Sequence, residues 1–170
     1  MKNNSKTQPH TAHRFPQSAK EKIKKYNPNA DFEMIKKAYK FARRAHKDET
    51  RLSGKPLINH CLAVANLLAD IKMDSATIAA GLLHDTLEHE KATKEEIEKA
   101  LGTKVAELVD GVSVIKKVKT KTGGWSQTEN FRKLLLATAK DVRVMLIRLA
   151  EKVHSVKTIE SLPKDLREET

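Results

Sequence analysis

Apolar side chains recur at intervals of three and four residues along almost the whole chain, and this spacing restricts the fold to helices. In residues 32–45 the recurring apolar positions are Phe32, Ile35, Tyr39, Ala42 and Ala45. Positions three or four apart share one face of an α-helix, whereas a strand alternates apolar and polar residues. No segment shows that alternation, so the sequence predicts an all-α fold.

Capping and turn residues divide this pattern into separate helices. Ser75 is suited to cap one helix, and Thr93 with Glu96 forms a capping box for a short helix that stops at Gly102. The basic residues 116–124 are expected to form a loop. Besides the short helix after Thr93, the predicted helices cover residues 18–26, 32–45, 57–71, 77–90 (the helix that Ser75 would cap), 105–118, 127–139 and 141–162.

The length of 170 residues matches one domain. Residues 1–17 are expected to form a flexible basic tail, and residues 18–170 the helical domain, which the final LPKDLREET extends as if cut from a longer protein. The single cysteine, Cys61, excludes a disulfide framework within the chain and fits a reducing compartment. No run approaches the roughly 20 apolar residues of a membrane span, so we expect a cytoplasmic domain with no membrane partner.

The charge balance favours an anionic partner. Lysine and arginine number 33 against 22 acidic residues, which gives a formal net charge of +11. Such a surplus attracts phosphorylated metabolites and nucleic acids alike. Aromatic residues make up only 4% of the chain and do not alternate with basic ones, so a nucleic acid is not the expected partner. A basic RNA-binding accessory module would rest on net charge alone.

The segment GLLHDTLEHE, residues 81–90, places His84 and Asp85 directly after an apolar run. On a helix that continued through this segment, His84 would lie over Glu88, and His89 would lie four residues beyond Asp85. A buried carboxylate is costly without a compensating cation or several hydrogen-bond donors. Asp85 is therefore a candidate metal ligand.

Two other apolar helices carry isolated polar groups. His60 lies in an apolar helix, and Arg148, Glu151, Ser155 and Thr158 form a polar stripe at helical spacing. Each group alone has a simpler explanation: a core histidine with its hydrogen bonds made, a solvated helix face, or a hydrogen-bonded pair at a helix end. Imidazole and carboxylate groups from separate helices together favour a divalent ion such as Mn²⁺, Fe²⁺ or Zn²⁺ with open coordination positions.

The order His60, His84-Asp85 and an acid at 151 resembles the HD-domain metallophosphohydrolases. More narrowly, several ordered segments resemble the hydrolase domain of the RelA/SpoT family, the (p)ppGpp synthetase-hydrolases. The resemblance runs from about residue 30 to the end, and the segments that carry it are AHKDETRLSGKPLINHCLAVA, GLLHDTLEHE, VAELVDGVSVIKKVK and QTENFRKLLLATAKDVRVMLIRLAEKVHSVKTI.

The resemblance implies an HD-domain helical bundle that holds one Mn²⁺ and removes the 3′-pyrophosphate of ppGpp or pppGpp to give GDP or GTP. It also implies synthetase and regulatory domains beyond this N-terminal part. By position, the implied metal ligands are His60, His84, Asp85 and Glu151. The implied catalytic positions are Glu88, which helps activate the attacking water, and His89. The implied substrate-binding positions are Arg51, Leu52, Ser155 and Thr158.

Several of these positions depart from the family pattern. His89 stands at the second acid of HDxxED, Glu151 replaces an Asp, and Ser155 replaces an Asn. The other departures are Asp48, Glu49, Leu52, Leu57 and Lys152. The metal-ligand types survive while the residues around them change. A second hypothesis is therefore a catalytically weak or inactive HD-like domain that binds nucleotide or regulates an adjoining synthetase domain.

Overall fold

The computed structural model describes residues 15–120, 132, 136 and 139–159. This part of the chain contains helices and no strand, which confirms the predicted all-α class. A single isolated bridge, between Thr50 and Pro56, closes the turn that follows the second helix. The helices are α1 (Gln17–Tyr26), α2 (Phe32–Ala45), α3 (Leu57–Asp70), α4 (Ser75–Leu83), α5 (Lys94–Leu101), α6 (Thr103–Thr120) and α8 (Arg143–Ile159).

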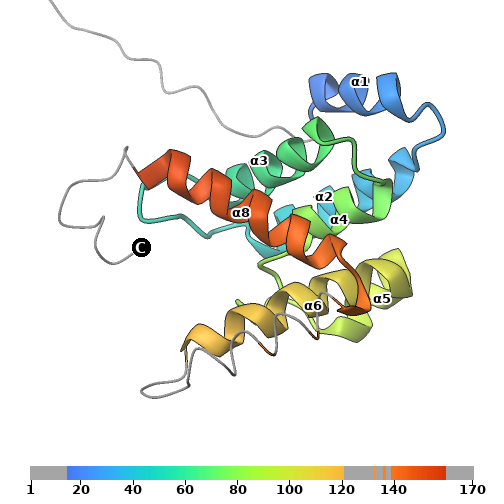
Figure 1. Ribbon diagram of the computed structural model, residues 1–170. Helices are drawn as coiled ribbons and strands as arrows, with labels where there is room; N and C mark the ends of the chain where they lie inside the picture. The colour runs from blue at the N-terminus through green and yellow to red at the C-terminus, as the bar shows by residue number, and fades with distance from the viewer. Residues whose placement is uncertain (1–14, 121–131, 133–135, 137–138, 160–170) are drawn as a thin grey trace, which may run out of the picture.

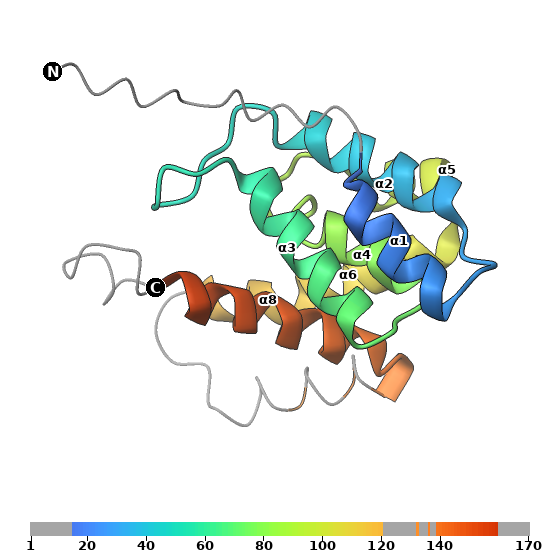
Figure 2. The ribbon, with the colours of Figure 1, turned by 90° about the horizontal axis from the view of Figure 1, so that it is seen from above.

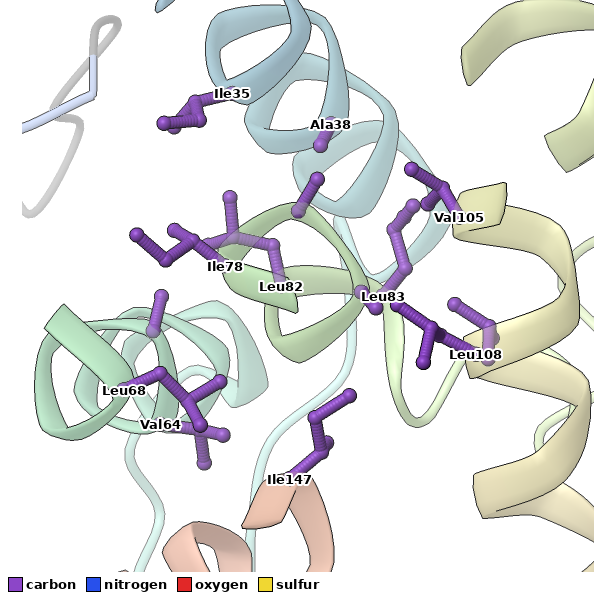
Figure 3. Close-up of a cluster of buried hydrophobic side chains, with 14 of the residues drawn as sticks. Ile35, Ala38, Val64, Leu68, Ile78, Leu82, Leu83, Val105, Leu108 and Ile147 are labelled. Carbon is purple, nitrogen blue, oxygen red and sulfur yellow. The ribbon is translucent and has the colours of Figure 1, made fainter. Parts of the chain in front are cut away.

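Helix α4 lies at the centre of the bundle, in contact with α2, α3, α6 and α8 (Figures 1 and 2). Every residue of α4 from Thr77 to Leu83 is buried, because its sequence is apolar on all sides. Figure 3 shows Ile78, Leu82 and Leu83 of α4 surrounded by side chains of α2, α3, α6 and α8. The residues that follow α4 therefore emerge inside the molecule, where a polar site can be screened from water.

Gly81 allows α4 to approach α3 closely. A Cβ at this position would meet Leu68 Cδ1 of α3 at a distance too short for two carbon atoms, and Val64 Cγ1 at 3.6 Å. Leu68 is fully buried and cannot swing into solvent. The Gly81 carbonyl itself lies next to the ring of His84.

Replacing Gly81 with alanine is expected to lower the free energy of unfolding by about 1 kcal/mol. Overpacking against Leu68 costs roughly 1–3 kcal/mol, which outweighs the gain in helix propensity of about 1 kcal/mol. Urea denaturation of the wild type, Gly81→Ala, Leu68→Val and the double variant measures this. The double variant should lose less free energy of unfolding than the two single variants lose together, because Leu68→Val removes the Cδ1 atom that the new Cβ would meet. An unchanged or raised stability in Gly81→Ala would contradict the close-approach argument.

The helix predicted at residues 77–90, which corresponds to α4, is wrong at both ends. Asp74, not Ser75, caps α4, because the Asp74 carboxylate accepts from the Thr77 amide at 2.7 Å. Ser75 Oγ instead accepts from the amide of Asp31 at 2.9 Å. The helix ends at Leu83 and residues 84–90 form turns, whereas the helical pattern predicted an end at residue 90.

Two side chains explain why α4 stops at Leu83. His84 Nδ1 lies 2.8 Å from the carbonyl oxygen of Gly81, and Thr86 Oγ1 donates to the carbonyl oxygen of Leu83 at 2.7 Å. The Thr86 amide also donates to Leu83. These carbonyls would accept amides four residues later if the helix continued, so local side-chain hydrogen bonds compete with its next turn.

The remaining helix predictions largely agree with the structure. The Thr93–Glu96 capping box is present, and α5 ends before Gly102, which has a φ of +90°. The loop predicted at residues 116–124 is wrong up to residue 120, since α6 continues through Thr120. The predicted tail up to residue 14, residues 121–124 and most of the predicted 127–139 helix lie outside the described residues. Within the described ranges, no helix is long and apolar enough to cross a bilayer.

Candidate metal centre and adjoining pocket

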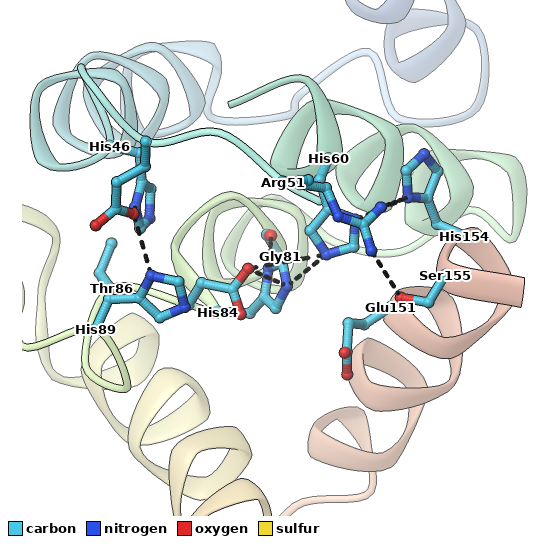
Figure 4. A network of polar contacts seen from close by, with 12 residues as sticks. His46, Arg51, His60, Gly81, His84, Thr86, His89, Glu151, His154 and Ser155 are labelled. Atoms are coloured by element: carbon cyan, nitrogen blue, oxygen red, sulfur yellow. Dashed lines mark hydrogen bonds and ion pairs between the residues drawn. The ribbon is translucent and has the colours of Figure 1, made fainter. Parts of the chain in front are cut away.

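Three predicted ligands from two segments meet in the interior. His60 projects from α3, and His84 and Asp85 come directly after α4. His60 Nε2 lies 3.2 Å from His84 Nε2, and Asp85 Oδ2 lies 3.1 Å from His84 Nε2 and 3.8 Å from His60 Nε2 (Figure 4). All three residues are buried, and their ligand atoms lie within 4.8 Å of one another. This is a donor set that suits a divalent transition-metal ion.

Hydrogen bonds on the far side of each ring orient the two imidazoles. His84 Nδ1 faces the Gly81 carbonyl at 2.8 Å, so this nitrogen carries the proton and Nε2 presents its lone pair to the cluster. His60 Nδ1 lies 2.7 Å from His154 Nδ1 and can donate to it, which leaves His60 Nε2 as the lone-pair nitrogen. Both rings thus carry the tautomer that a metal ligand needs.

Burial keeps His60 neutral. Desolvation, with help from the neighbouring His84, lowers the pKa of His60 to about 2. A neutral imidazole is the form that binds a metal ion, so the ring does not need to lose a proton to water before an ion binds.

His154 is a site residue that the sequence analysis missed. It lies on α8, three residues after Glu151 and four before Thr158, so it shares the face of the predicted polar stripe. Its pKa is lowered by burial and by the nearby Arg51 guanidinium. The helical spacing that selected Glu151 and Thr158 also selects His154, and could have identified it.

Glu151 on α8 lines the cavity beside the cluster, but its carboxylate is paired. Oε2 accepts from Arg148 on the preceding turn of the helix, and Oε1 lies 3.9 Å from Lys152 Nζ. Arg148 and Glu151 are both buried. The converging ligand atoms are those of His60, His84 and Asp85, and Glu151 lies beside them, in the wall of the same cavity.

Arg51 connects the turn after α2 to helix α8. Its guanidinium donates to Thr158 Oγ1 at 3.1 Å and to Ser155 Oγ at 3.4 Å, and lies 3.5 Å from His154 Nδ1. A hydrogen bond from the Arg51 amide to the Lys55 carbonyl, at 2.9 Å, closes the turn that holds it. The structure therefore brings together three of the predicted substrate-binding residues. Leu52, the fourth, is 59% exposed at the rim.

Glu88 and His89 lie next to the buried cluster through Asp85. The His89 amide donates to the Asp85 carbonyl at 3.1 Å, which preserves one helix-like bond within the turns. As a result, Asp85, Glu88 and His89 offer ligand atoms within 4.8 Å of one another. The structure thus keeps the predicted approach of His89 to Asp85, although the continuous helix that led us to expect it is absent.

Two adjoining cavities meet at this cluster. One, of about 450 Å³, is lined by Arg51, His60, Asp85, His89 and Glu151 among others. The other, of about 510 Å³, is lined by Arg51, Lys55, Asn59, His154 and Thr158 among others. Arg51 and His60 line both. The ligand cluster therefore opens on one side toward acids and on the other toward cationic and hydroxyl groups, an arrangement that suits a phosphorylated ligand.

The chain is similar in sequence to proteins named as (p)ppGpp synthase/hydrolases and GTP pyrophosphokinases. It is 43% identical over 151 residues to the Escherichia coli K12 protein named bifunctional (p)ppGpp synthase/hydrolase SpoT, covering 89% of this chain and 22% of that protein. It is 40% identical over 146 residues to the Myxococcus xanthus GTP pyrophosphokinase, covering 84% and 19%. The chain thus spans about a fifth of the length of these relatives.

A solved structure shares the fold. The structure reported as "A metazoan ortholog of SpoT hydrolyzes ppGpp and plays a role in starvation responses" aligns with a TM-score of 0.62 and 25% identity. The alignment covers 80% of this chain and 78% of the metazoan chain. The family model described as HD domain matches residues 38–170. The chain therefore belongs to the HD domain family, and the resemblance to RelA/SpoT proteins predicted from its motifs is confirmed.

Proposed function

We propose that this domain hydrolyses the 3′-pyrophosphate of ppGpp or pppGpp, releases GDP or GTP with pyrophosphate, and depends on Mn²⁺. The observation that carries the proposal is the buried cluster of His60, His84 and Asp85, which opens onto a pocket containing Arg51. The similarity to the E. coli and metazoan proteins supports the choice of substrate. The proposal also has the domain act in the cytoplasm, next to a synthetase domain of a longer protein, and the similarity to the bifunctional E. coli protein supports this second point.

The buried cluster fits a divalent ion. Its two imidazoles present lone pairs inward, and Asp85 contributes the negative charge that a buried cation requires. His60, His84 and Asp85 would hold Mn²⁺, with Glu151 as the fourth ligand. A bound ion lowers the pKa of a water and polarises a phosphoryl oxygen.

The protein side chains perform the remaining steps. Glu88, in the turn beside Asp85, takes the proton of the attacking water. The Arg51 guanidinium, already aligned by Ser155 and Thr158, turns its donors to the phosphate oxygens. Burial of the pocket floor strengthens these charge interactions relative to water.

His154 positions His60 for this role, and His154→Ala is expected to weaken Mn²⁺ binding by about 10–100-fold. The variant removes the partner of His60 Nδ1, and such supporting partners of metal-ligating histidines typically contribute this much. Titration calorimetry on chelator-treated protein measures the affinity. His154→Gln, which retains an acceptor oxygen, should keep part of it. Equal affinity in the wild type and His154→Ala would contradict the positioning role.

Turnover of ppGpp tests the proposed function directly. Protein is incubated with ppGpp and Mn²⁺, and GDP and pyrophosphate are separated chromatographically. His84→Ala serves as the blank, because it removes one ligand from the cluster. Turnover in the wild type above this blank supports the proposal, and none above it overturns the hydrolase assignment.

A second function is favoured by one observation, the pairing of Glu151 with Arg148. If that pair holds when Mn²⁺ is supplied, the metal lacks its fourth protein ligand, and the domain binds nucleotide or regulates an adjoining synthetase domain instead. Nucleotide binding measured in parallel with turnover separates the two functions. Tight binding of ppGpp without release of GDP supports the regulatory function.

A further inference from the structure

A second group of potential ligands lies beyond Asp85. His46 Nδ1 is 2.7 Å from Glu49 Oε2, and His89 Nδ1 is 3.1 Å from the same oxygen. The His46 and His89 rings meet edge to face with centroids 5.7 Å apart (Figure 4). The three ligand atoms lie within 4.8 Å of one another, as in the cluster around His84. Two imidazoles and a carboxylate therefore converge twice in this small region.

Backbone hydrogen bonds hold the two segments that supply this second group. His46 follows the last residue of α2, and its amide donates to the Ala42 carbonyl at 2.9 Å. The Glu49 amide donates to the His46 carbonyl at 3.2 Å, and the Glu49 carbonyl accepts from the Leu57 amide at 2.9 Å. His89 is held by its bond to the Asp85 carbonyl, so the three side chains are fixed by the fold rather than gathered by chance.

We propose that His46, Glu49 and His89 form a second site for a divalent cation, and that the chain binds two ions side by side. Two imidazole nitrogens and one carboxylate oxygen suit borderline ions such as Zn²⁺, Fe²⁺ or Mn²⁺, and leave further coordination positions open. The side chains in the group range from buried to partly exposed, with His46 1% and the His89 side chain 38% accessible. An ion can therefore enter from the His89 side.

The two sites adjoin. Asp85 belongs to the first cluster and His89 to the second, and Glu88 offers an oxygen within 4.8 Å of the ligand atoms of both residues. Glu49, His89, Asp85 and His60 line the same cavity of about 450 Å³. A phosphate group in this cavity would lie between two ions, with the Asp85 and Glu88 carboxylates close to both. Paired ions of this kind stabilise the attacking and leaving oxygens of phosphoryl-transfer reactions.

The protonation states of the second group suit a cation. Burial lowers the pKa of His46, which favours the neutral ring. Burial alone would raise the pKa of Glu49, but hydrogen bonds from Lys91, His46 and His89 lower it to about 2 and keep the carboxylate ionised. His46 Nε2 has no hydrogen-bond partner within the described structure, so it is open to carry the ring proton when an ion replaces the contact of Nδ1 with Glu49.

Lys91 is the competing cation at this site. Its ammonium lies 3.0 Å from Glu49 Oε1, the oxygen that faces away from the two imidazoles, and its side chain is 42% exposed. The lysine can therefore move into solvent when an ion binds at Oε2. Removing its charge should tighten the second site without removing a ligand, which provides a matched variant for the test.

The test counts the ions per chain in the absence of nucleotide. Chelator-treated protein is dialysed against Zn²⁺, and in parallel Mn²⁺, and metal is measured by mass spectrometry. The wild type is expected to hold two ions. Glu49→Gln and His89→Gln should each hold one, and His84→Gln should lose the other ion. Glu49→Gln combined with His84→Gln should hold none, and Lys91→Met should bind the second ion several-fold more tightly.

Either of two results would overturn the second site. One is a single ion per wild-type chain in excess metal, and the other is two ions retained in both Glu49→Gln and His89→Gln. Circular dichroism checks that each variant is folded, and the two single variants, in separate segments, test the site independently. The ion count is measured without nucleotide and does not depend on ppGpp turnover. The second site can therefore be tested even if the domain does not hydrolyse ppGpp.

Discussion

His84→Asn is expected to lose at least about 1,000-fold of ppGpp turnover while the domain remains folded. The histidine uses its two nitrogens differently: Nδ1 bonds the Gly81 carbonyl at 2.8 Å, and Nε2 points at His60 and Asp85. Asparagine can place an amide N–H near the first position but has nothing at the second. The variant thus keeps the helix-end hydrogen bond and removes a proposed ligand of a metal ion, and such an ion contributes several kcal/mol to catalysis.

Two measurements separate this effect from unfolding. Thermal denaturation should show a melting temperature within a few degrees of the wild type, and Mn²⁺ affinity should fall together with turnover. His84→Ala serves as the comparison, because it loses the Gly81 bond as well and should be less stable. Turnover within tenfold of the wild type in a folded His84→Asn would show that this histidine is not part of the reaction centre.

Apolar periodicity together with capping patterns predicted α2 and α5 correctly. The range 32–45 predicted for α2 matches the structure, and the Thr93 capping box and Gly102 stop for α5 are also found. The end of α4 was wrong because it depends on hydrogen bonds from His84 and Thr86 to the preceding carbonyls. Periodicity reports which face is apolar, and it carries no information about side chains that compete for a backbone acceptor.

In the site, too, the sequence predicted residues marked by a pattern within one segment and missed contacts between distant segments. His60, His84 and Asp85 stood out as polar residues in apolar surroundings, which is a signal within each segment. The contact between Glu49 and His89 joins positions 40 residues apart, and no spacing rule relates them. It appeared in the sequence only as two separate departures from the family pattern. The structure shows that these two altered positions contact each other.

The pairing of Glu151 with Arg148 shows what the replacement of the family's Asp by Glu151 changes on α8. Both side chains are buried, so each charge compensates the other, and removing one alone would leave a buried charge exposed to a low-dielectric interior. Under the proposed function, a cation at His60, His84 and Asp85 would compete with Arg148 for the same carboxylate. The proposed fourth ligand position would then be contested, and the expected activity depends on which cation Glu151 prefers.

The double variant Glu151→Asp with Ser155→Asn is expected to raise ppGpp turnover by up to about 100-fold, the scale on which small displacements of catalytic groups act. Aspartate shortens the side chain by one methylene, which draws the carboxylate away from Arg148 on the preceding turn and back toward the geometry of the family pattern. Asparagine restores an amide beside Arg51 at position 155, where the guanidinium now meets the Ser155 hydroxyl at 3.4 Å. Steady-state turnover and Mn²⁺ affinity are measured on the same preparations.

Arg148→Met is the control that identifies the cause. It keeps Glu151 and its length but removes the competing charge, with a side chain of similar reach that can stay buried. If Arg148 holds the carboxylate away from the ion, this variant should tighten Mn²⁺ as the double variant does. If the length of Glu151 is what limits activity, only the double variant should raise turnover. Unchanged turnover and unchanged Mn²⁺ affinity in both would mean that Glu151 has no part in the centre, because neither freeing nor shortening its carboxylate then changes what the metal binds.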